Sequence, residues 1–207
     1  MLTSLKSCDH LYIGADDSNH AGTNKKGEII AVTFSIFRED SVVKEQVNRR
    51  DPRRAYNLLN SEGRDYAFTI LTDERSKHCG YNLVLAVPLL VEEYLKGKGT
   101  GLSLTLNLYF DGPLRGYQRR FVCESFPRHT AHADGFCKKE LSVHSQKRAT
   151  SLRCPDIVIA ADAIAHDLYT NHTLENLLTD PHMIAVSHEE MAARNFRLRS
   201  DWLQQSF

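Results

Sequence analysis

Residues 10–17 read His-Leu-Tyr-Ile-Gly-Ala-Asp-Asp, an apolar run that ends on two adjacent carboxylates. A polar stretch with Asn, Gly and Lys follows, and residues 28–37 (Glu-Ile-Ile-Ala-Val-Thr-Phe-Ser-Ile-Phe) are rich in β-branched and aromatic side chains. Such side chains favour strands, whereas Asn and Gly favour turns. The two runs therefore predict an antiparallel pair of strands, the first of which ends at Asp16 and Asp17.

The pattern of apolar residues predicts the remaining elements. A short helix begins at Pro52. Apolar residues recur at helical spacing over residues 81–95, where Pro88 is expected to kink the helix or move its start later. Further strands are expected at 66–71, 102–110 and 140–144, further helices at 114–126 and 156–169, and a loop at 127–138. A capping box at 187–190 opens a last helix that extends to about Leu203.

This order of elements predicts an α/β fold. Three strands come in succession and are followed by helix, strand, helix, strand and helix. Consecutive strands form hairpins, and strands separated by helices pair in parallel through right-handed crossovers. We expect a mixed five-stranded sheet, three antiparallel strands and then two parallel ones, flanked by helices. Residues 1–207 are read as a single domain with a C-terminal helical extension over 171–207.

The composition narrows the class of protein. The 207 residues include 26 Lys and Arg against 26 Asp and Glu, so the net charge is zero, which argues against coating of nucleic acid or membranes by bulk charge. No apolar window reaches the length of a membrane span. The five cysteines are scattered without a Cys-x-x-Cys pair and are interpreted as reduced thiols. We expect a soluble, cytoplasmic protein without a membrane partner.

Carboxylates interrupt apolar runs at three places. Asp16 and Asp17 end the first strand, Asp111 directly follows the fourth, and Asp162 lies inside the apolar helix of residues 157–165. A buried carboxylate is costly unless it is paired or binds a metal. Carboxylates from strand ends and a packed helix can converge, and Mg²⁺ or Mn²⁺ favours such oxygen ligands. Two ions about 3.5–4 Å apart can activate a water and stabilise the leaving oxygen of a phosphodiester.

Each carboxylate also has a structural interpretation. The aspartate pair suits the start of a polar turn, and Asp111 before Gly-Pro suits a helix N-cap. Asp162 could face solvent or pair with Arg153 or Lys147. Asp167 is read as exterior or capping, although it remains a candidate fourth ligand if the helix is rotated.

Three motifs resemble ribonuclease H-like proteins. Residues 12–22 (Tyr-Ile-Gly-Ala-Asp-Asp-Ser-Asn-His-Ala-Gly) are similar to the opening strand of type 2 ribonuclease H, and to the Tyr-Ile-Asp-Glu-Ser-Gly strand of an uncharacterised ribonuclease H-like family. Residues 108–112 (Leu-Tyr-Phe-Asp-Gly) resemble the fourth strand of the type 2 enzymes. Residues 157–165 resemble the late helix of the uncharacterised family, which supplies the last acidic residue. The resemblance implies a ribonuclease H-like fold in which the four aspartates bind metal and act in catalysis.

The resemblance also has departures. Asp17 replaces the usual Glu, which shortens that ligand. Asn19 and His20 stand where the type 2 enzymes carry the Gly-Arg-Gly that grips an RNA–DNA junction, so we expect them to face the substrate. His166 follows Asp162 by four positions, shares its helix face and could orient a water or contact phosphate.

Basic residues precede the helix that carries Asp162. Lys147, Arg148 and Arg153 would position phosphates through charge-assisted hydrogen bonds, and Arg115, Arg119 and Arg120 could serve likewise. Zinc is a weaker alternative to magnesium or manganese. It would use His129, His132 and Cys137 with Cys123 or His144, but solvated histidines are the preferred interpretation because no close cysteine pair supports it.

We therefore expect a divalent-metal-dependent nuclease that uses Mg²⁺ or Mn²⁺ and hydrolyses RNA, DNA or a hybrid of the two. The alternative is a catalytically inactive ribonuclease H-like module that binds nucleic acid or a protein, suggested by the shortened Asp17 and the neutral charge. A third hypothesis is hydrolysis or transfer on a small phosphorylated molecule.

Overall fold

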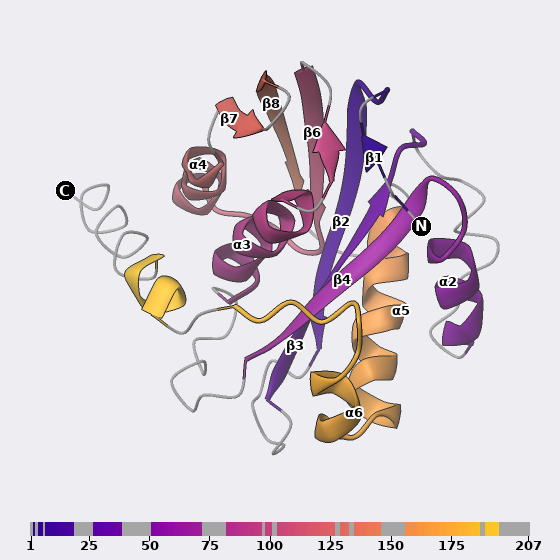
Figure 1. Cartoon of the computed structure of the whole chain (residues 1–207). Coiled ribbons are helices and arrows are strands. Elements are labelled where there is room, and N and C mark those ends of the chain that lie inside the picture. Colours follow the sequence, from indigo (N-terminus) through magenta and orange to yellow (C-terminus); the bar gives the residue numbers. More distant parts are fainter. Residues whose placement is uncertain are drawn as a thin grey trace.

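The computed structural model describes residues 2, 4–5, 7–18, 27–38, 51–71, 82–96, 98–100, 103–126, 129–132, 135–145, 156–186 and 189–194. Its main sheet is built from β2 (His10–Ser18), β3 (Glu28–Ser35), β4 (Arg64–Leu71), β6 (Ser103–Phe110), β7 (His129–His132) and β8 (Gly135–Ser145). The spatial order is β4-β3-β2-β6-β8-β7 (Figure 1). A separate two-stranded parallel sheet joins β1 (Ser4–Leu5) to β5 (Gly99–Thr100).

The directions of the strands confirm the predicted mixed sheet. β2, β3 and β4 pair antiparallel, whereas β6 pairs parallel with β2 and β8 pairs parallel with β6. The five expected strands are therefore present, with three antiparallel and two parallel members. The sixth strand, β7, pairs antiparallel with β8.

The predicted loop at 127–138 is wrong for much of its length. Residues 129–132 form β7, and β8 begins at Gly135 instead of at residue 140. These residues are polar and histidine-rich, so their local propensity for strand is weak. Pairing with the neighbouring strand supplies the backbone hydrogen bonds that stabilise the strands here, and such pairing leaves no local signal in the sequence.

Four helices agree with the expected ones within a few residues: α2 (Pro52–Leu59), α3 (Asn82–Lys96), α4 (Gly116–Ser125) and α5 (Asp156–Asn171). A further helix, α6 (Leu174–Leu178), lies in the expected C-terminal extension but was not predicted by itself. Pro88 lies inside α3, so the expectation that it delays the helix start is wrong. Residues 189–194 are helical, while the rest of the predicted last helix lies outside the described residues. None of the helices in the described ranges is long and apolar enough to cross a membrane.

Alternation along the strands separates two apolar layers (Figure 1). On one side, Leu11, Ile13 and Ala15 of β2 join the core formed with α3 and α4. On the other side, β3 and β4 pack against α2 and α5. Because neighbouring residues point to opposite faces, Gly14 and Asp16 belong to the α5 side of β2.

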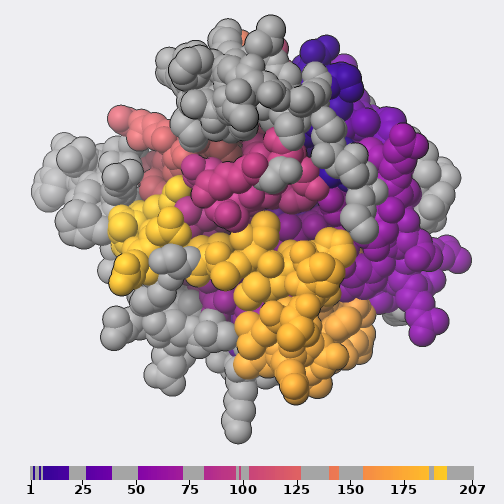
Figure 2. Space-filling model, in the orientation of Figure 1, coloured from indigo at the N-terminus to yellow at the C-terminus, as the bar shows by residue number. Residues whose placement is uncertain are grey.

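The chain after α6 returns to the edge of the sheet. Phe68 N–H in β4 donates to the carbonyl of His182 at 3.0 Å, and Ile184 N–H donates to the carbonyl of Phe68 at 2.8 Å. Figure 2 shows this part of the chain crossing the surface as a band next to α3. These residues therefore cover part of the β4 edge, which would otherwise expose unpaired backbone groups.

Candidate acidic active site

The ends of two neighbouring strands bring Asp16 and Asp111 together. Ala15 and Phe110 are register partners in the parallel β2–β6 pair, and Asp111 N–H donates to the carbonyl of Ala15 at 3.2 Å. Phe110 is buried on the α3 face of the sheet, so the side chain of the next residue, Asp111, projects from the α5 face, as that of Asp16 does. The chain then turns at Gly112, whose φ of 82° is a conformation that favours glycine.

A close approach of α5 to β2 brings Asp162 to the same place. A Cβ atom on Gly14 would lie 2.5 Å from the carbonyl oxygen of Ile157, so only glycine lets the first turn of α5 lie this close. Distances can be counted from the point where Gly14 of β2 meets Ile157 of α5. Asp16 is two residues after Gly14, about 7 Å along the strand, and Asp162 is five residues after Ile157, about 7.5 Å along the helix axis. The two side chains therefore lie at similar distances from this point.

The charges of the neighbouring aspartates change the pKa of Asp16. Asp16 is only 6% exposed. Its burial, followed by the charges of Asp162 and Asp111, raises its pKa from 3.8 to about 8. Asp17 adds a smaller charge effect, while its N–H donates to Asp16 Oδ1 at 2.8 Å and opposes the shift. Among the described residues, the three side-chain charges that raise the pKa of Asp16 are all carboxylates.

Asp17 has a different position from Asp16. It pairs with Ile30 in the β2–β3 register and is half-buried. Because successive side chains of a strand point to opposite faces, the Asp17 side chain projects from the α3 face of β2. Among the three carboxylates that raise the pKa of Asp16, it has the smallest effect.

Two structural interpretations of the aspartates are wrong. Asp16 and Asp17 do not start a turn, since both lie inside β2 and pair with β3. Asp111 is not the N-cap of the next helix, because α4 begins at Gly116 and Arg115 is its N-cap. The solvent-facing alternative for Asp162 is not favoured, because its side chain is half-buried.

The other predicted site residues divide into two groups. His166 is exposed on α5 and does not figure among the groups that shift the pKa of Asp16. The predicted substrate-binding residues lie outside the described residues; they are Asn19, His20, Lys147, Arg148 and Arg153. The zinc alternative finds no support in the described part, where Cys123 is exposed and His144 stacks on Tyr109.

The surroundings of Asp16 differ from those of the other buried carboxylates. Four carboxyl side chains in the described ranges are buried, namely Asp16, Glu28, Asp65 and Asp167. Glu28 accepts a hydrogen bond from Asn82 Nδ2 at 2.5 Å. The other two accept hydrogen bonds or pair with cations, as described below. For Asp16, by contrast, burial and then the neighbouring carboxylates Asp162 and Asp111 raise the pKa of the carboxyl.

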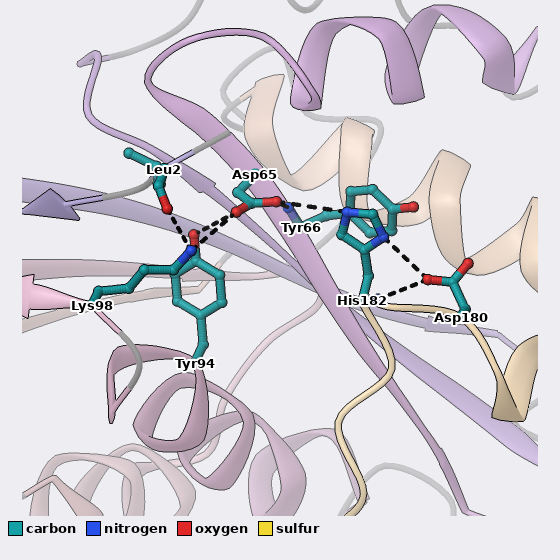
Figure 3. Close-up of polar contacts among 7 residues, drawn as sticks. All are labelled: Leu2, Asp65, Tyr66, Tyr94, Lys98, Asp180 and His182. Atoms are coloured by element: carbon teal, nitrogen blue, oxygen red, sulfur yellow. Dashed lines mark hydrogen bonds and ion pairs between the residues drawn. The ribbon is translucent and has the colours of Figure 1, made fainter.

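Asp65 lies at the centre of a network that was not expected from the sequence (Figure 3). It accepts a hydrogen bond from Tyr94 Oη at 2.9 Å and lies 3.5 Å from Lys98 Nζ. His182 stacks on Tyr66, with Nε2 3.9 Å from Asp65. These contacts join β4, α3 and the chain after α6, and they compensate the Asp65 charge.

The expectation for Asp167 is also wrong. This residue was expected at the exterior or in a cap, but it is 7% exposed. It accepts hydrogen bonds from Tyr56 Oη at 2.9 Å and Asn171 Nδ2 at 2.7 Å, and it pairs with His172 Nε2 at 3.2 Å. This satisfied carboxylate stabilises the contact of α2 with α5, so it is not a candidate fourth ligand.

The acidic cluster fits a divalent cation in charge and donor type. Asp16 is buried among carboxylates, and carboxylate oxygens are ligands that Mg²⁺ and Mn²⁺ prefer. Within the part of the chain that is described, no three His, Cys, Asp or Glu side chains are already grouped to hold an ion. The carboxylates would therefore have to turn towards one another around a cation, which rotation of short Asp side chains permits.

Comparisons with known proteins give no family. No protein-family model matches the chain, and none of the curated proteins compared with it matches its sequence.

Proposed function

We propose that the chain is a ribonuclease H-like, divalent-metal-dependent nuclease that hydrolyses phosphodiester bonds of nucleic acid. The observation that carries the proposal is the raised pKa of Asp16, a buried carboxyl next to Asp162 and Asp111. Perturbed groups of this kind concentrate at functional sites. The sheet order supports the resemblance noted in the sequence, since β2, which carries Asp16 near its end, lies next to β6, which Asp111 directly follows.

The hypothesis drawn from the sequence gives each aspartate a role, and the burial of Asp16 supports its central one. Asp16, the most buried of the cluster, would be shared between two ions, with Asp111 completing the set of the first. Asp162 and Asp17 would hold or orient the second, and His166 or Lys147 would assist the leaving group or the phosphate. Bound Mg²⁺ or Mn²⁺ supplies activation of water and neutralisation of the leaving oxygen.

The raised pKa gives this proposal a pH dependence. A metal-binding carboxyl must lose its proton, and Asp16 holds its proton to about pH 8 when no cation is present. Metal affinity should therefore increase from pH 6 to pH 8, with release of a proton on binding.

The test is cleavage of single-stranded, duplex and RNA–DNA hybrid substrates in Mg²⁺ or Mn²⁺. Asp16→Asn and Asp111→Asn should each lower the rate by more than about 100-fold, because each removes a ligand. Asp9→Asn is the matched control, since Asp9 is exposed directly before the same strand and the variant should keep full activity. An Asp16→Asn protein as active as the wild type would remove the mechanism.

The position of Asp17 favours one alternative. Because the Asp17 side chain projects from the α3 face of β2, a second ion beside Asp16 would have fewer protein ligands than a two-metal site requires. A ribonuclease H-like module that binds nucleic acid or a protein without cleavage would then result. It predicts no heat of Mn²⁺ binding in calorimetry and nucleic-acid affinity that is insensitive to Asp16→Asn.

A further inference from the structure

One face of the sheet next to the acidic cluster is open in the described part. Val143 of β8 is buried against the α3 side, whereas Glu140, Ser142 and His144 are exposed on the opposite face. This is the α5 side of the sheet, but α5 packs on β2 and β3 (Figure 1). In the described residues the face of β8 therefore remains exposed beside the site, whereas Tyr109 on the same face of β6 is half-buried.

Two planar side chains stack on this open face. Tyr109 of β6 and His144 of β8 are register partners, and their rings lie 4.5 Å apart at an interplanar angle of 14°. Tyr109 is half-buried and His144 is exposed. Tyr109 also precedes Asp111 by two residues, about 7 Å along an extended chain. The stacked pair thus continues directly into the acidic cluster.

A cation lies at the edge of the same strand. β7 pairs with β8 only as far as Lys138, so the later residues of β8 are not covered by β7. At that edge the exposed Arg119 of α4 donates from Nη2 to the carbonyl of Val143. Partial desolvation and the nearby Arg119 charge lower the pKa of His144, and the Arg119 guanidinium supplies a positive charge beside the ring.

We infer that Tyr109, His144 and Arg119 form a platform for single-stranded nucleic acid that leads into the acidic cluster. The inference rests on the proposed nuclease function and assigns its substrate class. Aromatic rings stack on bases of any sequence, and a guanidinium can contact phosphate or stack in turn. A duplex conceals the faces of its bases, so the platform selects unpaired strands.

The experiment measures fluorescence anisotropy of a labelled ten-residue oligothymidylate in EDTA, where no cleavage occurs. His144→Ala should weaken binding roughly tenfold, and His144→Phe should restore it because the planar ring returns. Arg119→Gln should weaken binding and reduce its salt dependence. A duplex of equal length should bind at least about tenfold more weakly. Because His144 is exposed, its substitution should leave the fold intact, and thermal melting of each variant verifies this.

A small diester separates the platform from the chemistry. Hydrolysis of bis(p-nitrophenyl) phosphate with Mn²⁺ reports the chemistry of the acidic cluster, and Asp16→Asn should abolish it. Wild-type affinity in both His144→Ala and Arg119→Gln, or equally tight duplex binding, would overturn the platform even if the diester is hydrolysed. Weakened oligonucleotide binding without diester hydrolysis by the wild type would support the platform and remove the proposed nuclease.

Discussion

Asp16→Asn should stabilise the metal-free protein. Asp16 is buried beside two other carboxylates, and its pKa rises from 3.8 to about 8 on folding. The unfolded chain therefore releases this proton near pH 4, whereas the folded protein holds it to about pH 8. Between these values the unfolded state binds fewer protons, so the free energy of unfolding falls as pH rises. Asparagine has no proton to lose, and its Oδ1 can still accept from Asp17 N–H.

The size of the effect follows from the pKa. Each pKa unit corresponds to about 1.4 kcal/mol, so a rise from 3.8 to about 8 costs on the order of 6 kcal/mol above pH 8 and about 4 kcal/mol at pH 7. Relaxation of the neighbouring carboxylates reduces this figure. We expect Asp16→Asn to gain at least about 2 kcal/mol at pH 7 and nothing at pH 4.

The assay is urea unfolding followed by circular dichroism in EDTA at pH 4, 6, 7 and 8. The difference between variant and wild type cancels the pH dependence of the other groups. Asp9→Asn, at an exposed position, should stay within about 0.5 kcal/mol of wild type throughout. An Asp16→Asn protein that is no more stable than wild type at pH 7 and pH 8 would refute the electrostatic reasoning.

Three further substitutions test how the site is supported. Gly14→Ala should destabilise by about 1–3 kcal/mol and lower activity, because its Cβ would meet Ile157 O at 2.5 Å and displace α5; unfolding and cleavage assays would measure both effects. Tyr94→Phe should cost about 1–3 kcal/mol in urea unfolding, since Asp65 loses a hydrogen bond while the ring remains. His182→Ala should speed amide exchange over residues 180–186 without changing cleavage, and unchanged exchange would contradict a docking role for its ring.

Local patterns were sufficient to predict most of the fold. The strands at 10–18 and 28–35 follow from β-branched and aromatic residues bounded by a polar stretch of sequence. The apolar helix around Asp162 follows from its composition, and the order of elements gives the pairing directions. β7 could not be predicted, because its polar sequence becomes a strand only through pairing with β8.

The candidate site was partly predictable. Carboxylates at strand ends indicated Asp16 and Asp111, and strict alternation along the strand would also have separated Asp17 from them. The structural role of Asp167 was not predictable, because its partner Tyr56 is 111 positions away in the sequence. A sequence pattern cannot distinguish a carboxylate that tertiary contacts will satisfy from one that they leave among other carboxylates.

The most direct measurement is the anomalous signal of Mn²⁺ in crystals of the wild-type protein at pH 8. The account predicts a peak within about 2.5 Å of carboxylate oxygens of Asp16 and of Asp111 or Asp162, and loss of this peak in Asp16→Asn crystals. An anomalous map at saturating Mn²⁺ with peaks only elsewhere, or with no peak at these carboxylates, would contradict the claim that they bind a cation together.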